Sequence, residues 1–402
     1  MSRPDRMSPT ELRAAISLSS IFGLRMLGMF VILPVFGIYA EGLPGGDNLT
    51  LVGIALGAYG LTQALLQIPF GWWSDRYGRK PVIYAGLAIF AAGSFVAALG
   101  THIYVVIAGR TLQGAGAISA AVMAMTADLT RDEHRGKAMA IIGSTIGAAF
   151  ALSLVVSPWL NRVIGVPGIF AMTGVLVLGA MGVVYGLVPD APERPVRAAA
   201  RGLDQFAAVL RDPQLTRLYY GVFALHAVLM ALFIAVPFNL RAAGLPVDQH
   251  WQVYLPVMAG SFVLMLPAVL GSPGPRRQKA ALVGSIAVLF LAHLALPWLA
   301  DGTWAIAAFL LVFFTAFNVL EAYLPTLVSR TAPGDSRGIA IGVFASLQFF
   351  GAFFGAAAGG FLYGSAGTAG VVILNAVLIV IWLAAAAGTR VPASRGGGHG
   401  GV

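Results

Sequence analysis

Twelve runs of about 20 mostly apolar residues dominate this sequence. An α-helix of that length crosses the roughly 30 Å of hydrocarbon in a bilayer and satisfies its own backbone hydrogen-bonding groups there. Only 10% of the 402 residues are charged, whereas an ordinary soluble domain carries about 25%. Polar side chains are therefore too few to cover a soluble surface, and the sequence predicts an all-α integral membrane protein with twelve transmembrane helices.

The predicted spans fall into two groups of six, residues 14–188 and 215–388, and we expect each group to form one helical bundle. A linker at residues 189–214, rich in proline and in charges of both signs, is expected to be solvated. We also expect a cytoplasmic segment at 1–13 and a disordered glycine-rich cytoplasmic tail at 389–402. The predicted spans are 14–40, 49–73, 81–99, 103–127, 138–160, 168–188, 215–240, 251–271, 280–299, 304–328, 339–363 and 369–388.

Lysine and arginine are distributed asymmetrically about these spans. Of the 25 such residues, Arg25 and Arg110 lie well inside spans, and Arg162 and Arg241 lie on the side opposite the N-terminus. Basic residues that flank spans resist translocation, so we expect both termini to be cytoplasmic. This asymmetry accounts for most of the net charge of +9. The charge therefore does not indicate a nucleic-acid partner.

The two halves resemble each other at a nearly constant offset. Residues 30–34 are similar to residues 233–237, 203 positions later, and residues 135–138 are similar to 337–340, 202 positions later. Together with the six-plus-six arrangement, this similarity suggests an internal duplication. Two related bundles that face each other can rock about their interface and expose a site to either side of the membrane in turn.

The loop after the second span combines glycines with charges of both signs, in the order GWWSDRYGRK. Glycine permits the tight reversal, and the aspartate is able to accept hydrogen bonds from free N–H groups at a neighbouring helix N-terminus. Any short cytoplasmic loop collects basic residues, so the glycines and the acid carry the signal. The candidate functional residues of this loop are Gly71, Asp75, Arg76, Gly78, Arg79 and Lys80.

This loop resembles the G-x-L-x-D-R-x-G-R-K signature of the major facilitator superfamily, with Trp73 in place of the leucine. Residues 109–116 are similar to the R-x-x-Q-G-x-G motif of that family's fourth span. Residues 24–30 and 64–80 are most similar to the YajR-type branch of proposed proton-driven drug exporters, although we expect no soluble C-terminal domain like the one in that branch. The resemblance implies a transporter that works as a monomer in the cell inner membrane.

The resemblance also implies roles for loop residues. In this family the loop aspartate, here Asp75, is thought to cap the eleventh helix, which is expected to begin near Gly338, in the outward-facing state. Its implied partners after the fourth span are Asp128 and Arg131. The matching loop of the second half, residues 271–279, lacks an acid, so we expect one such contact.

Three charged residues lie well inside predicted spans: Arg25, Arg110 and Glu321. A charge at this depth costs about 2.5–3.5 kcal/mol on insertion scales and marks a candidate site. Because desolvation raises the proton affinity of a carboxylate, Glu321 is the main candidate for proton coupling, with His226 and Arg25 as modulators. The resemblance links Arg110 to coupling or to substrate charge. A permanent ion pair of Glu321 with either arginine, a packing role for Arg110 and a neutral structural His226 are open alternatives.

Polar side chains also follow one face of particular spans. Tyr59, Gln63 and Gln67 recur every four residues, and Asn318 lies three residues before Glu321, so each set shares a helix face. Gln348 lies on the eleventh span. We expect these side chains to line a substrate cavity, although hydrogen bonding between helices would also explain them.

We therefore expect a secondary transporter that exports small amphipathic molecules or drugs in exchange for protons, by alternating access. Residues 143–147 keep two glycines of the family's exporter signature without its proline, which leaves the direction open. The alternative is proton-coupled import of a small nutrient, anionic in view of Arg25 and Arg110. We find no nucleophile–base cluster of an enzyme, no P-loop and no metal-ligand spacing, so no cofactor is expected.

Overall fold

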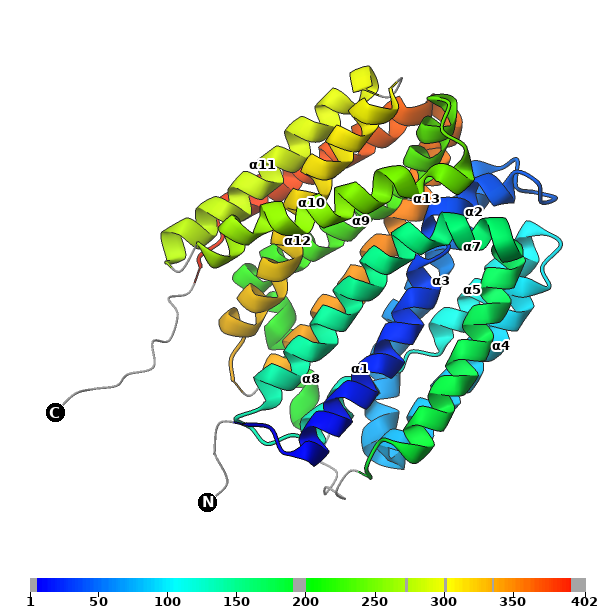
Figure 1. Cartoon of the computed structure of the whole chain (residues 1–402). Helices are drawn as coiled ribbons and strands as arrows, with labels where there is room; N and C mark the ends of the chain where they lie inside the picture. The colour runs from blue at the N-terminus through cyan, green and yellow to red at the C-terminus, as the bar shows by residue number, and fades with distance from the viewer. Residues whose placement is uncertain (1–5, 191–199, 272–273, 300–301, 335, 392–402) are drawn as a thin grey trace.

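The computed structural model describes residues 6–190, 200–271, 274–299, 302–334 and 336–391, which are mostly helical (Figure 1). The helices of the first half and linker are α1 (Pro9–Phe30), α2 (Leu33–Ala40), α3 (Leu49–Tyr77), α4 (Arg79–Ala98), α5 (Ile103–Ala115), α6 (Ser119–Asp128), α7 (Arg135–Gly186) and α8 (Ala200–Arg211). The second half contains α9 (Pro213–Ala242), the short 3-10 helix η1 (Val247–Gln249), α10 (Trp251–Leu270), α11 (Pro275–Leu299), α12 (Thr303–Thr331) and α13 (Arg337–Ala387).

Among the described residues, ten helical segments are long and apolar enough to cross a membrane. Two of these, α7 and α13, have 52 and 51 residues, enough for two crossings each. They turn at Gly165 and Gly367, whose φ values of 67° and 59° favour glycine. The turns fall where the sequence predicts the fifth and eleventh spans to end. The predicted all-α membrane fold is therefore confirmed, and the helices are consistent with twelve crossings.

Two of the predicted continuous spans are built from two helices each. The first breaks just ahead of Pro34, which has no N–H with which to continue a helix. The fourth breaks at Gly116, where an added Cβ would lie 2.3 Å from the carbonyl oxygen of Gly86, and at Gly114 it would lie 2.1 Å from that of Tyr59. Glycine thus allows this segment to approach the backbones of α3 and α4.

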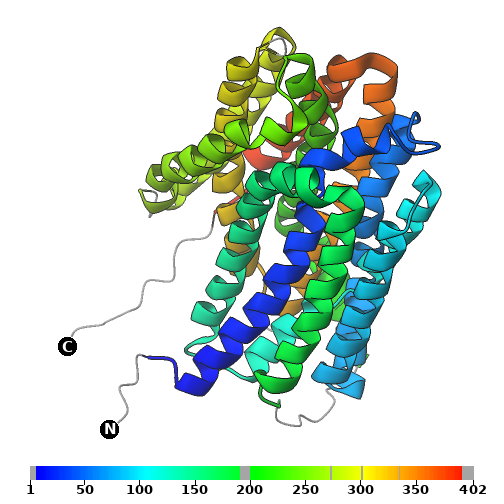
Figure 2. The same ribbon diagram turned by 45° about the vertical axis from the view of Figure 1, so that its right-hand side comes forward.

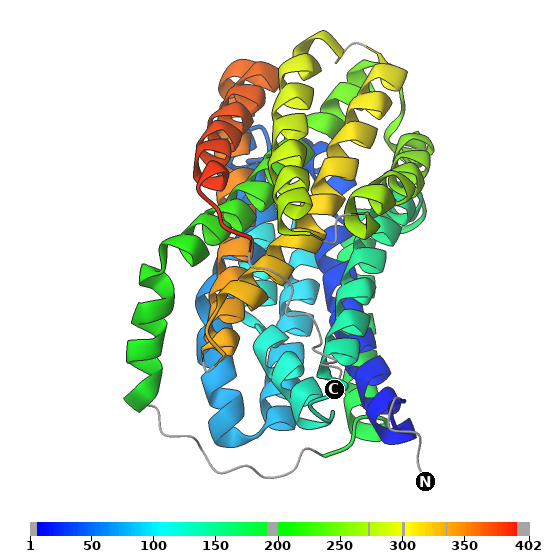
Figure 3. The ribbon, with the colours of Figure 1, turned by 90° about the vertical axis from the view of Figure 1, so that its left-hand side faces the viewer.

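The linker and the ends of the chain differ from the expectation in part. Helix α8 occupies part of the linker that charge alone predicted to be solvated (Figure 3). Phe206 and Val209 recur at helical spacing on it and pack into the hydrophobic core, and the helix contacts α9 and α13 of the second half. The backbone N–H of Arg390 donates to Gln214 Oε1 at 2.8 Å, so the start of the predicted disordered tail is held. Residues 191–199 and 392–402 lie outside the described residues.

The two ends of the bundle carry different charges. We call one the basic end, because it carries Arg79, Lys80, Arg131 and Arg135 at the ends of α3, α4, α6 and α7. The other, which we call the opposite end, carries acid–base pairs between the halves. Glu41 and Arg241 form a bidentate pair with O–N distances of 2.5 and 2.9 Å.

Contacts between the halves gather in the middle and at the opposite end. Helix α3 packs on α13, and a Cβ added at Gly53 would lie 2.1 Å from the carbonyl oxygen of Ala356. At the basic end, Cβ atoms added at Gly143 of α7 and Gly338 of α13 would meet nothing within 4 Å. The helices of the two halves accordingly spread apart toward the basic end (Figures 1 and 2).

Substitutions of these glycines can distinguish contacts within one half from contacts between the two halves. A Cβ at Gly355 would lie 2.0 Å from the carbonyl oxygen of Ala227, within the second half. We expect Gly355→Val to lower the thermal unfolding midpoint strongly, because overpacking costs about 1–3 kcal/mol or more. Gly53→Val should leave each half folded and increase labelling of a cysteine placed at the opposite end, because only the contact between halves is lost.

Gly143→Val is the matched control, since its side chain would enter open space. Thermal unfolding in detergent and cysteine-labelling rates check all three variants. Equal unfolding midpoints for Gly355→Val and Gly143→Val would contradict the packing argument.

Candidate functional site

Glu321 lies in the middle of α12, ten residues before the end of the helix at the basic end, or about 15 Å along its axis. Its side chain is 38% exposed. Oε1 accepts a long hydrogen bond of 3.5 Å from Gln348 Nε2, and Oε2 lies 3.7 Å from His226 Nε2. Oε2 is buried and accepts no hydrogen bond from the described residues. The structure therefore brings together the predicted acid, histidine and glutamine.

His226, on α9, has a defined proton arrangement. Its Nδ1 lies 3.1 Å from the carbonyl oxygen of Val222, and only a protonated nitrogen can bond to a carbonyl. Nδ1 therefore carries the hydrogen, and Nε2, 2.8 Å from Gln348 Nε2, accepts a hydrogen bond from that amide. The edge of the ring packs against Phe317, with centroids 5.9 Å apart.

Close packing of α13 on α9 brings Gln348 to this position. Gly351 lies one turn further along α13, and a Cβ there would lie 2.3 Å from the carbonyl oxygen of Phe223. The backbones of the two helices meet here, so a glutamine on the same face of α13 reaches the imidazole. The sequence contained this signal, since glycines recur along α13, but their partner helix could not be identified from it.

The two arginines lie elsewhere, in the first half. Arg25 is fully buried, donates to Ser119 Oγ at 2.8 Å and to Gln63 Oε1, and lies 5.5 Å from the Tyr59 ring centroid. Arg110 donates to the carbonyl oxygens of Ala55 and Leu56 and to the side chain of Gln113. None of the ion pairs between described residues includes either arginine. In this arrangement Glu321 has no permanent ion pair with Arg25 or Arg110.

The polar side chains that the sequence predicts to line a substrate cavity have different surroundings in the structure. Gln63 and Gln67 are buried, and Gln63 Nε2 donates to Gln67 Oε1 at 3.2 Å. Tyr59 packs edge-on against Phe349 of the second half, with centroids 6.3 Å apart, and lines a cavity of about 20 Å³ between the halves. Asn318 instead donates to Ser261 Oγ at 3.1 Å and joins α12 to α10.

Aromatic side chains close the site toward the opposite end. Phe150, on α7, packs against Phe30 in its own half, with ring centroids 4.9 Å apart. It also packs against Phe233 and Phe317 of the second half, at 6.5 and 6.2 Å. Sequence reasoning missed Phe150, because one aromatic residue in an apolar span carries no distinguishing signal.

The charged loop forms a compact network at the basic end. Arg79 pairs with Asp75 at 2.5 Å and with Asp128 at 2.9 Å. Two other basic residues of the loop have partners outside the network: Arg76 stacks on Trp72 and Lys80 pairs with Asp190 at 2.7 Å.

The turn and its surroundings are set by glycines. Gly78, with φ of 93°, forms the turn between α3 and α4, and a Cβ at Gly71 would touch Ala120 at 3.3 Å. Among the described contacts, Asp75 pairs with Arg79 and accepts no hydrogen bond from the start of α13, so the implied cap on α13 is not made in this arrangement.

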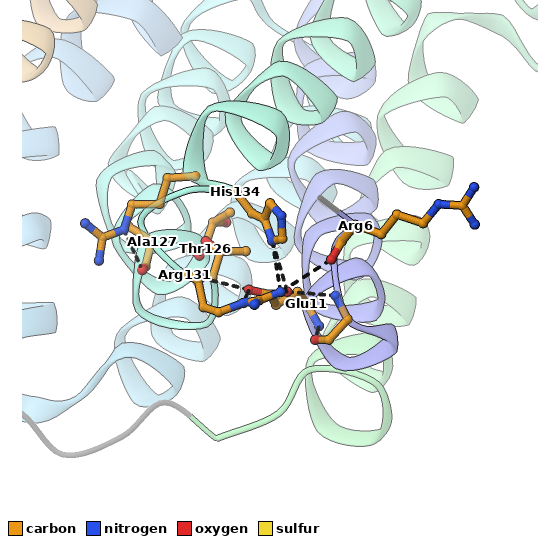
Figure 4. Close-up of polar contacts among 9 residues, drawn as sticks. Arg6, Glu11, Thr126, Ala127, Arg131 and His134 are labelled. Atoms are coloured by element: carbon orange, nitrogen blue, oxygen red, sulfur yellow. Dashed lines mark hydrogen bonds and ion pairs between the residues drawn. The ribbon is translucent and has the colours of Figure 1, made fainter. Parts of the chain in front are cut away.

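Arg131 pairs with Glu11, which sequence reasoning did not single out (Figure 4). Glu11 lies in the first turn of α1, ahead of the apolar run. It accepts hydrogen bonds from the backbone and side chain of Arg131 and from the N–H of Ser8, and it lies 3.3 Å from His134 Nδ1. The capping box of Ser8 and Glu11 was visible in the sequence as S-x-x-E. The guanidinium of Arg131 holds the pKa of Glu11 well below its ordinary value.

A partly exposed acid at mid-depth in one of two helical bundles that pack against each other suits a transporter. The family model described as the Major Facilitator Superfamily matches residues 18–356. The chain belongs to this superfamily. It is thus a membrane transporter and not an enzyme.

Two relatives and one solved structure illustrate the superfamily likeness. The inner membrane transport protein YajR of Escherichia coli (strain K12) is 41% identical over 96% of this chain and 85% of its own length. Multidrug resistance protein 1 of Bacillus subtilis (strain 168) is 24% identical over 89% of this chain and 91% of its own. A bacterial homologue of the human lysosomal transporter Spinster, in an inward-facing and occupied conformation, shares the fold, with a TM-score of 0.72, 14% identity and coverage of 95% and 97%.

The Glu11 cluster makes a pH-dependent contribution to stability. We expect Glu11→Gln to lower the unfolding midpoint at pH 7 by about 2–4 °C, because Arg131 and His134 lose their carboxylate partner. The folded pKa lies below that of the unfolded chain, so the contribution is complete above pH 4.5 and declines as the pH falls below it.

Scanning fluorimetry from pH 7 to pH 4 checks this, with the exposed Glu133→Gln as control. The gap between wild type and Glu11→Gln should narrow on acidification. A gap that stays constant over this range would contradict the charge-based account.

Proposed function

We propose that this chain is a proton-coupled secondary transporter that exports small amphipathic molecules by proton antiport, with Glu321 as the main proton site. The observation that carries the proposal is the position of Glu321. It lies at mid-depth in the second half, next to His226 and partly exposed. The two halves spread apart toward the basic end, and Phe150 and its neighbours close the space between them toward the opposite end. An acid in such a place meets water from one side at a time.

The basic end is cytoplasmic in this proposal, which makes the described arrangement inward-facing. The positive-inside bias supports that orientation, with both termini cytoplasmic in a multi-pass protein of the inner membrane. In the inward-facing state Glu321 would release its proton to the cytoplasm and the cavity would take up substrate. In the outward-facing state the acid would take up a proton from the outer side as substrate leaves.

Two sets of contacts would favour the two states. The inward-facing state has the Glu41–Arg241 pair and the weaker Arg162–Asp248 contact at 3.8 Å, both between halves. The only two basic residues that the sequence places outside are therefore both in contact with an acid of the other half. In the outward-facing state the resemblance supports a contact of Asp75 with the start of α13, near Gly338.

The substrate class rests on the lining and on the relatives. Aromatic and aliphatic side chains such as Phe150 and Phe317 surround the acid, as suits an amphipathic molecule. Multidrug resistance proteins among the relatives support the same class. The resemblance to the family supports a protein that acts as a monomer.

A second candidate, proton-coupled import of a small anion, is favoured by one observation. Arg25 is fully buried, its described contacts are with neutral groups, and its Nε has no hydrogen-bond partner among the described residues. A substrate carboxylate or phosphate would complement that charge. The direction of proton flow when substrate is added separates import from export.

Replacing Glu321 with glutamine tests the proton site. We expect Glu321→Gln to abolish transport driven by a pH gradient in reconstituted vesicles, with ethidium as the probe, because glutamine takes up no proton. Exchange of ethidium without a gradient should continue. Asp132→Asn, which removes an exposed acid at the basic end, is the matched control. Gradient-driven transport at the wild-type rate by folded Glu321→Gln would remove Glu321 from this role.

The pair at the opposite end tests the conformational assignment. Glu41 and Arg241 are both more than 40% exposed, and exposed pairs contribute up to about 1 kcal/mol, or about a fivefold change in an equilibrium. We expect Glu41→Arg to raise the ratio of the outward-facing to the inward-facing state by up to about fivefold. Adding Arg241→Glu should restore the balance. Distances between spin labels at the opposite end measure it, and failure of the double variant to reverse the shift would contradict a direct pairing.

A further inference from the structure

The amide of Gln348 faces two acceptors that belong to different helices. Gln348 Nε2 lies 2.8 Å from His226 Nε2 on α9 and 3.5 Å from Glu321 Oε1 on α12. An amide NH₂ group has two hydrogens, so this one nitrogen can donate to both. The side chain therefore joins the two titratable groups of the site.

This geometry fits only one protonation form of the histidine. His226 Nδ1–H donates a hydrogen bond to the carbonyl oxygen of Val222. In the neutral ring, Nε2 therefore carries no hydrogen and is an acceptor. A proton added at Nε2 would point at the NH₂ group of Gln348 and displace it. Likewise, Glu321 Oε1 is a stronger acceptor for the amide while the carboxyl group is ionised, because a charged acceptor strengthens the hydrogen bond.

We propose that Gln348 is a positioning residue that favours neutral His226 and ionised Glu321 while the site faces the basic end, and thereby promotes proton release to that side. The inference deepens the proposed function and rests on it. Gln348 is not itself a proton carrier, because an amide does not titrate. It acts through the hydrogen bonds that it offers to the two groups that do.

Several other titratable side chains on α9, α11 and α12 have partners elsewhere. The phenol groups of Tyr219, Tyr220 and Tyr323 donate to the carbonyl oxygens of Ala340, Leu378 and Ala268, respectively. His293 on α11 bonds to the carbonyl oxygen of Leu289. Arg25 and Arg110 lie in the first half and are bonded within it. Among the described contacts, Gln348 is thus the donor that His226 Nε2 and Glu321 share.

Protonation of the pair is linked to the position of α13. Glu321 Oε2 and His226 Nε2 are 3.7 Å apart, too far for a hydrogen bond, so a proton shared between them requires the amide to turn away and the two groups to approach. Phe349, the next residue on α13, packs on Tyr59 of the first half, and a Cβ at Gly60 would lie 2.6 Å from the Phe349 carbonyl oxygen. A shift of Gln348 therefore reaches the interface between the halves.

The test uses the conformational equilibrium of the full chain, so that it needs no transported substrate. The chain contains no cysteine, and Asp47 and Ser365 are exposed at the opposite end on different halves. Spin labels at Asp47→Cys and Ser365→Cys would report the closed fraction of that end from pH 5 to pH 9 by double electron–electron resonance. The closed fraction should rise with pH as the pair loses its proton.

Gln348→Met keeps the length of the side chain and removes the donor. We expect this variant to lower the proton concentration at the midpoint of the titration about tenfold, which moves the midpoint to higher pH. Gln348→Glu, which places an acceptor beside the pair, should move it further in the same direction. Gln278→Met, the same substitution at the basic end, should leave the midpoint unchanged. A Gln348→Met midpoint equal to that of wild type would overturn the inference, even if thermal unfolding shows that the variant is less stable.

Glu321→Gln in the same labelled chain separates the two proposals. If it removes the pH dependence while Gln348→Met leaves the midpoint in place, only the inference about Gln348 fails. If Glu321→Gln titrates like wild type, the proposed proton site fails, and with it the role of Gln348.

Discussion

The hydrocarbon around this chain is the constraint on which the rest of the structure depends. No water is available there to satisfy polar groups, so the backbone is helical and each polar side chain inside the bundle must find a partner within the protein. Arg110 finds backbone carbonyls of α3, and Asn318 finds Ser261. Glu321 differs because its carboxylate has only a long hydrogen bond from Gln348 and a histidine beyond bonding distance. An incompletely satisfied acid at this depth is a natural site for reversible protonation.

Glycine decides how closely the helices approach and therefore where that site forms. Within the second half, Gly351 and Gly355 place α13 against the backbone of α9 and bring Gln348 to His226. Between the halves, Gly53 and Gly60 place α3 against the same helix. Helix α13 is thus shared by the proposed proton site and by the interface that would rearrange in alternating access. Coupling between the two requires only that this helix moves as a body.

Much of the architecture was predictable because it depends on length, apolarity and local charge. The described helices agree with the predicted all-α membrane fold, including turns at Gly165 and Gly367 between predicted spans. The candidate set Glu321, His226 and Gln348 also followed from the sequence, because ionisable and amide side chains are rare in apolar spans. The interaction partners of the charged side chains could not be predicted from the sequence. Arg131 was expected beside Asp75 and pairs with Glu11, and Arg25 bonds to Gln63 and Ser119 rather than to an acid.

The sequence by itself determined that this is a membrane protein of two similar helical halves, because hydrophobic length and charge asymmetry act locally and need no knowledge of contacts. It also determined which few polar groups are buried in hydrocarbon. Only the tertiary structure decided which of them meet, since residues up to 122 positions apart are brought together by close backbone packing that no local pattern encodes. The meeting of His226, Glu321 and Gln348, and the separation of both arginines from that acid, depend on how the helices pack in space.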